Sequence, residues 1–209
     1  MKQTPGGGAI PPPGRSISPD EWPRSRTFGL LAGMYLCRPS REAIEGWRSF
    51  FGKEAPDPLR GLHASLLAVD PSEKSVLDDL LWEYTRLFIG PYRLPCPPWE
   101  SVYTSPKRLL MQEAYDAVQD LYREAGLTIP DTHIHADHIG SELNFLAVLY
   151  ERAESGTGDG VKATEMAERF LSEHLRKWVP AFSRDLEAAA ETDLYRELSR
   201  ATRAVVASA

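Results

Sequence analysis

Residues 70–88 read DPSEKSVLDDLLWEYTRLF, and their apolar side chains recur at the spacing of one helix face. Asp70-Pro71-Ser72-Glu73 has the composition of a helix start. The residues that share the face are Leu77, Leu80, Leu81, Tyr84, Leu87 and Phe88. The stretch therefore predicts a helix whose strongly apolar face packs against other elements.

The same periodicity extends along most of the chain and predicts one helix after another. A capping box at Ser18-Pro19-Asp20-Glu21 opens the first helix, and Gly126 is placed to end a later one. Besides the helix at 70–88, the expected helices cover 18–37, 40–51, 105–125, 137–154, 161–189 with a break or kink at Pro180, and 192–207. Residues 90–104 hold four prolines and predict an irregular connection. With no strand-like alternation and no internal repeat, the prediction is an all-α, single-domain helical bundle of about eight helices.

Composition limits the classes of protein to consider. A chain of 209 residues suits one domain with one core, and residues 18–209 are expected to form it. Residues 1–17, rich in proline and glycine, predict a disordered tail. The net charge of −6 argues against a nucleic-acid binder with a basic face. No apolar run approaches the roughly 18 residues of a membrane span, and no secretory signal is visible, so a cytoplasmic protein is expected.

Residues 131–146, DTHIHADHIGSELNFL, carry three of the five histidines. His133, His135, Asp137 and His138 match the H-x-H-x-D-H pattern of dinuclear zinc hydrolases. That site needs the ends of sheet strands and later ligands, whereas His174 is the only later histidine and is expected on an ordinary helix face. A mononuclear metal site of His133, His135, His138 and Glu142 stays open as an alternative, beside a polar loop that leads into a helix.

Two segments together resemble a known family. Residues 83–103, EYTRLFIGPYRLPCPPWESVY, contain an E-x-x-x-L-F-x-G-P core, a proline-rich loop and a closing E-S-x-Y. Residues 137–145, DHIGSELNF, follow at a fitting separation. Residues 170–186 and 28–44 show two weaker similarities to the same family. These segments resemble the redox-enzyme maturation chaperones of the TorD, DmsD and NarJ group.

The resemblance implies an all-helical cytoplasmic binding protein that is not an enzyme and has no cofactor of its own. Its partner would be the N-terminal twin-arginine signal, or a remnant of one, of a molybdenum or iron–sulfur oxidoreductase subunit during cofactor insertion and before export. Neither nucleic acid nor stable membrane insertion is expected. A monomer and a domain-swapped dimer are both compatible with the sequence. Two alternatives remain, a metal-dependent hydrolase and a helical scaffold for a folded partner.

A signal peptide needs an apolar groove for its hydrophobic region and carboxylates for its arginine pair. Tyr84, Leu87 and Phe88 are candidates for the groove, with plain core packing as the alternative. Candidate walls are Pro91, Tyr92, Trp99 and Tyr103. Candidate arginine partners are Asp137 and Glu142, with Glu100 as a third. His138 is expected to orient a carboxylate or cap a helix, while Asp137 also qualifies as the N-cap of the helix that contains Leu143 and Leu146.

Overall fold

The computed structural model describes residues 22–51, 54–91, 93–128, 134–156 and 159–209. Its α-helices are α1 (Arg24–Leu36), α2 (Arg41–Phe51), α3 (Arg60–Ala68), α4 (Lys74–Tyr84), α5 (Glu100–Thr104), α6 (Glu113–Glu124), α7 (Ile139–Glu154), α8 (Gly160–Phe170), α9 (Arg176–Ala189) and α10 (Asp193–Ser208). A 3₁₀ turn, Asp57–Leu59, precedes α3, and π-helical segments Thr85–Ile89 and Leu171–Leu175 follow α4 and α8. Within these ranges there is no β-strand, which confirms the all-α prediction.

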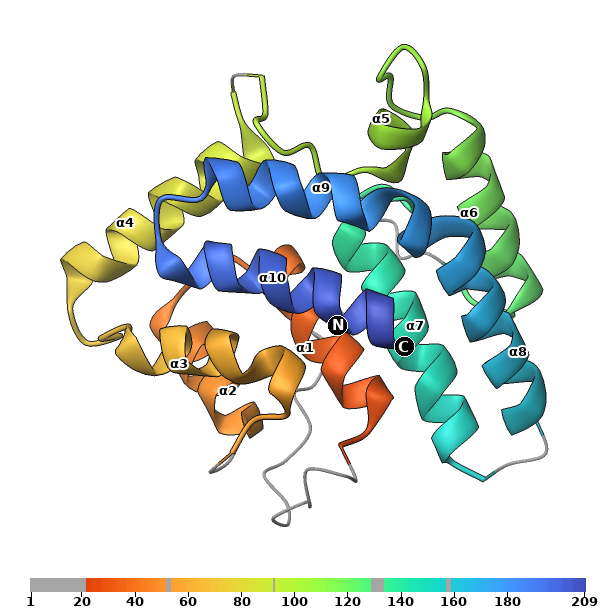
Figure 1. Ribbon diagram of the computed structural model, residues 1–209, viewed down its shortest axis with the longest axis horizontal. Coiled ribbons are helices and arrows are strands. Elements are labelled where there is room, and N and C mark those ends of the chain that lie inside the picture. The colour runs from red at the N-terminus through yellow and green to blue at the C-terminus, as the bar shows by residue number, and fades with distance from the viewer. Residues whose placement is uncertain (1–21, 52–53, 92, 129–133, 157–158) are drawn as a thin grey trace, which may run out of the picture.

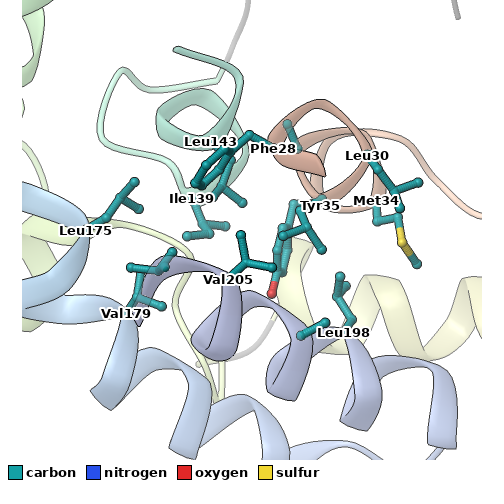
Figure 2. Packing of buried hydrophobic residues seen from close by; sticks show 14 of the residues in the cluster. Phe28, Leu30, Met34, Tyr35, Ile139, Leu143, Leu175, Val179, Leu198 and Val205 are labelled. Carbon is teal, nitrogen blue, oxygen red and sulfur yellow. The ribbon is translucent and has the colours of Figure 1, made fainter. Parts of the chain in front are cut away.

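Helix α1 lies at the centre of the bundle and packs along α7 (Figure 1). Its side chains Phe28, Leu31 and Tyr35 are almost completely buried. Figure 2 shows α1, α7, α9 and α10 contributing side chains to one continuous core. The close approach of α7 to α1 requires a glycine, because a Cβ added at Gly140 would lie 2.5 Å from Cγ of Leu36. No helix in the described ranges is long and apolar enough to cross a membrane.

The predicted helix at 70–88 starts later and ends differently than expected. Asp70 accepts hydrogen bonds from the backbone nitrogen and the hydroxyl of Ser72, which makes a turn, so α4 begins only at Lys74. From Thr85 the hydrogen-bond pattern is π-helical, which rotates the following side chains relative to those of α4. Leu81 was predicted on the apolar face, but it is 36% exposed.

The boundaries predicted around residues 90–125 are also wrong. The short helix α5, Glu100–Thr104, lies inside the stretch predicted to be irregular. Residues 105–112, predicted to be helical, connect α5 to α6 without a helix, and Arg108 and Met111 there have φ values of 51° and 54°. Helix α6 begins at Glu113, and Gly126 follows its end with φ 66°, as the C-cap prediction requires.

The helix predicted at 161–189 is not broken at Pro180. Pro180 is inside α9, and the chain changes direction between α8 and α9 at the π-helical segment Leu171–Leu175 (Figure 1). The carbonyl that Pro180 leaves without its helical donor is that of Arg176, the first residue after this segment. The first helix begins at Arg24, after Pro23, instead of at Ser18. The predicted tail, 1–17, and the capping box lie outside the described residues.

Candidate functional site

The proline-rich loop after α4 is tied to the start of α7 by backbone pairing. Trp99 and His138 form an isolated antiparallel bridge. The backbone nitrogen of Glu100 donates to the carbonyl of Asp137 at 2.9 Å, and that of Ile139 donates to the carbonyl of Pro98 at 2.8 Å. The two segments that carry the family resemblance therefore lie against each other.

Asp137 caps a helix, but a different one from that predicted. Its Oδ2 accepts the backbone N–H of Ser101, 3.1 Å away, in the first turn of α5. The N-cap of α7 is His138, whose Nδ1 accepts the N–H of Gly140 at 3.0 Å, which confirms the capping role expected of that histidine. Burial, followed by the nearby His135, lowers the pKa of His138 to about 3. The ring therefore stays neutral and keeps its acceptor nitrogen.

A buried polar cluster joins three segments of the family pattern. Nδ1 of His174 lies 2.7 Å from Oε2 of Glu100, and both side chains are buried, so the prediction of an ordinary helix face for His174 is wrong. One turn further, Nε1 of Trp178 donates to Oε2 of Glu142 at 3.0 Å. The π-helical segment Leu171–Leu175 contains His174, and so links the bend between α8 and α9 to α5.

The surroundings of Glu142 favour the protonated form of its carboxyl. Burial is the largest cause that raises the pKa of its carboxyl well above the usual value, and the negative charge of Glu100 is the second. Asp137, Glu142 and Glu100 are 0%, 0% and 2% exposed. The sequence predicted that these carboxylates pair with a client arginine, but an arginine cannot reach them in this conformation.

The first part of the signature also has structural roles. The carboxylate of Glu83 accepts the backbone N–H groups of Glu191 and Thr192, at 2.6 and 3.1 Å, and so fixes the connection that leads into α10. Leu87 and Phe88 are buried in the core, as is Tyr84, whose hydroxyl donates to the carbonyl of Tyr35. These three candidates lie inside the protein, in accord with the alternative of core packing.

Of the remaining candidates, Trp99 lines a pocket at the surface. Pro91 is exposed, Trp99 and Tyr103 are half-buried, and Tyr92 lies outside the described residues. The pocket has a volume of about 480 Å³ and is open to solvent between the proline-rich loop and residues 105–112, two connections that project from the same side of the molecule (Figure 1). Its lining residues are Arg93, Leu94, Pro95, Pro97, Trp99, Val102, Arg108 and Leu110.

A second, larger hollow of about 620 Å³ lies between α6, α7 and α8. The larger hollow is lined by charged groups of both signs, including Glu124, Arg152 and Arg169, which pair with the protein itself. Among the described residues, no three histidine, cysteine, aspartate or glutamate side chains come together as metal ligands, and His133 lies outside them.

Sequence reasoning missed Arg108 and Leu110, which line the pocket, and Asp185, which lies beside Arg108. Tyr103 donates its hydroxyl to Oδ2 of Asp185 at 3.2 Å, and Arg108 lies over the Tyr103 ring. Burial and then the charge of Asp185 raise the pKa of Tyr103, so its hydroxyl remains a donor. Leu110 lines the pocket although its segment was predicted to be helical. In the sequence, Asp185 looks like any acidic residue on the solvent face of an amphipathic helix.

Comparison with known proteins shows the family of the chain. Residues 42–184 match the model of the nitrate reductase delta subunit family, which is well over half of the chain. The chain belongs to this family. The matched range contains the proline-rich loop, the segment around Asp137 and His138, and both His174 and Trp178.

Individual relatives are named as chaperones of the DmsD and TorD group. A Haemophilus influenzae protein assigned as the Tat proofreading chaperone DmsD is 29% identical over 62% of this chain and 60% of its own length. The chaperone protein TorD of Aliivibrio salmonicida is 24% identical over 77% of this chain and 80% of its own. The chain thus spans less than two thirds of the DmsD relative. A crystal structure of an Archaeoglobus fulgidus protein assigned to redox enzyme maturation has a TM-score of 0.57, covers 86% of this chain and 91% of its own, and at 23% identity supports the fold.

Proposed function

We propose that this protein is a cytoplasmic chaperone that binds the N-terminal twin-arginine signal, or a remnant of one, of a molybdenum or iron–sulfur oxidoreductase subunit while its cofactor is inserted and before export. Family membership and the names of the relatives support this class of function. Binding, and not catalysis, is the proposed role.

The observation that carries the proposal is the position of the pocket. It is lined by the proline-rich loop of the family signature, and Trp99 joins this lining to the segment around His138. Most of its lining side chains are apolar, which suits the hydrophobic region of a signal peptide. Pro91, Trp99 and Tyr103 are the proposed surface contacts, and the buried candidates hold the loop and α5 in place.

Co-purification tests the proposal with complete proteins. Precursors of the oxidoreductase subunits encoded in the same genome are produced with and without their N-terminal signals, and each is mixed with the tagged protein. We expect at least one precursor to be retained only when its signal is present. Retention that is the same without the signal would favour the scaffold alternative, and retention of none of them would contradict the proposed function.

A further inference from the structure

The connection between α5 and α6 has an unusual conformation. It contains Lys107-Arg108-Leu109-Leu110-Met111, here called the KRLLM segment. Arg108 and Met111 both have positive φ, in the left-handed region that side chains other than glycine rarely adopt. Leu109, Leu110 and Met111 are 49%, 41% and 56% exposed. The protein thus combines an unfavourable backbone with three exposed apolar side chains in one short segment.

Arg108 lies in a seat made of one carboxylate and one aromatic ring. Its guanidinium nitrogen is 3.8 Å from Oδ2 of Asp185, and its guanidinium carbon is 5.2 Å from the centroid of the Tyr103 ring. Tyr103 donates to the same carboxylate oxygen and packs against Trp178 and Phe182, which fixes the ring. A carboxylate beside an aromatic face is the chemistry that recognises arginine.

This contact is weak enough to be displaced. The side chains of Arg108 and Asp185 are 53% and 40% exposed, and their separation of 3.8 Å is long for a charged hydrogen bond. Exposed pairs of this kind contribute little to stability because water and salt screen them. Arg108 therefore occupies the Asp185–Tyr103 seat without being locked into it.

The KRLLM segment and a signal peptide have the same order of residue types along the chain. Basic residues come first and apolar residues follow, as in the charged and hydrophobic regions of a targeting signal. Leu110 lines the same pocket as Arg108. A peptide with an arginine followed by leucines would make equivalent contacts, with its guanidinium on Asp185 and its apolar side chains in the pocket.

We propose that the KRLLM segment is an internal competitor of the client peptide, in which Arg108 holds the Asp185–Tyr103 seat until an arginine of the client displaces it. The inference rests on the proposed function and assigns the arginine contact to a residue outside the family signature. Displacement removes one of the two arginines that line the pocket, Arg93 and Arg108, and lets the client arginine take the free carboxylate. Displacement also allows the backbone of Arg108 to leave its unfavourable positive-φ conformation.

Calorimetric titration with a synthetic twin-arginine signal peptide tests the inference. We expect Arg108→Gln to bind the peptide about two- to fivefold more tightly than the wild-type protein, because the competing exposed pair is gone. Asp185→Asn should bind it more weakly by a similar factor, while its amide oxygen still accepts from Tyr103. In the Asp185→Asn background, Arg108→Gln should give no further gain.

The matched control is Arg123→Gln on α6, which changes the net charge equally at an exposed pair with Asp120. A peptide with glutamine in place of both arginines is the second control and should not distinguish Arg108→Gln from the wild-type protein. Two results would overturn this inference while leaving the proposed function in place. In the first, the wild-type protein and Arg108→Gln bind the peptide with the same affinity. In the second, Arg108→Gln raises the affinity as much in the Asp185→Asn background as in the wild-type protein. If the wild-type protein bound no signal peptide, the proposed function would fail and the inference with it.

Discussion

At the scale of single residues, burial decides what the acidic side chains of the signature do. Asp137 and Glu142 were predicted as arginine partners because carboxylates recognise guanidinium groups and the family pattern contains both. The sequence cannot show that both side chains are completely buried, since burial depends on how α5 and α9 cover them. In the structure one carboxylate caps α5 and the other accepts from Trp178.

Glu142 should make the stability of the protein depend on pH in a definite direction. A raised folded-state pKa means that its contribution is complete below the usual value of 4.5 and is lost as pH rises through the folded pKa. Glu142→Gln removes this dependence while keeping an acceptor for Trp178. Urea unfolding from pH 4.5 to 8 should therefore show the wild-type protein losing stability relative to the variant as pH rises. A relative gain would contradict the raised pKa of Glu142.

Substitutions of Asp137 distinguish a role in stability from a role in peptide binding. Asp137→Ala leaves the buried N–H of Ser101 without its acceptor and should cost about 1–3 kcal/mol of unfolding free energy. Asp137→Asn keeps an acceptor oxygen and should cost less. Since the side chain is completely buried, we expect the asparagine variant to bind a twin-arginine peptide as the wild-type protein does. A clear loss of affinity in folded Asp137→Asn, absent from the exposed control Asp120→Asn, would restore Asp137 to the binding site.

At the scale of elements, the helices that the sequence predicted correctly are those with a continuous apolar period. Helices α2, α7 and α10 begin and end close to their expected limits. The errors cluster where tertiary contacts override local pattern. Helix α5 forms in a proline-rich stretch because Asp137 caps its first turn from another part of the chain, and residues 105–112 leave the helical conformation although their pattern is helical.

The anchoring of α5 gives a stability prediction. His174→Ala leaves the buried carboxyl group of Glu100 without its hydrogen-bond partner, and a buried polar group left unsatisfied typically costs about 1–3 kcal/mol. Denaturant unfolding should show a loss of this order, whereas Arg123→Ala, at the exposed pair with Asp120, should change stability far less. Equal effects of the two substitutions would show that the Glu100–His174 contact does not hold α5 on the bundle.

At the scale of the whole molecule, the all-α fold and the family followed from the sequence, because apolar periodicity and the order of the motifs are local properties. The proposed binding surface did not, since the pocket is formed by two connections whose paths depend on the packing beneath them. The acidic net charge of −6 attracts a basic peptide at long range, so binding is expected to weaken as salt rises. In the proposed function, the short-range contacts of the peptide come from the pocket.

The central claim is that this protein binds a twin-arginine signal by its hydrophobic region and its arginines. Titration calorimetry of the wild-type protein with such a peptide, repeated at several temperatures so that a vanishing binding enthalpy at one of them is not misread, tests it most directly. We predict saturable binding with a dissociation constant in the micromolar range, about −8 kcal/mol. Changing the leucines of the hydrophobic region to serine should weaken binding more than changing the arginines to lysine, because apolar burial supplies most of the free energy. No saturable binding at any temperature would contradict the account.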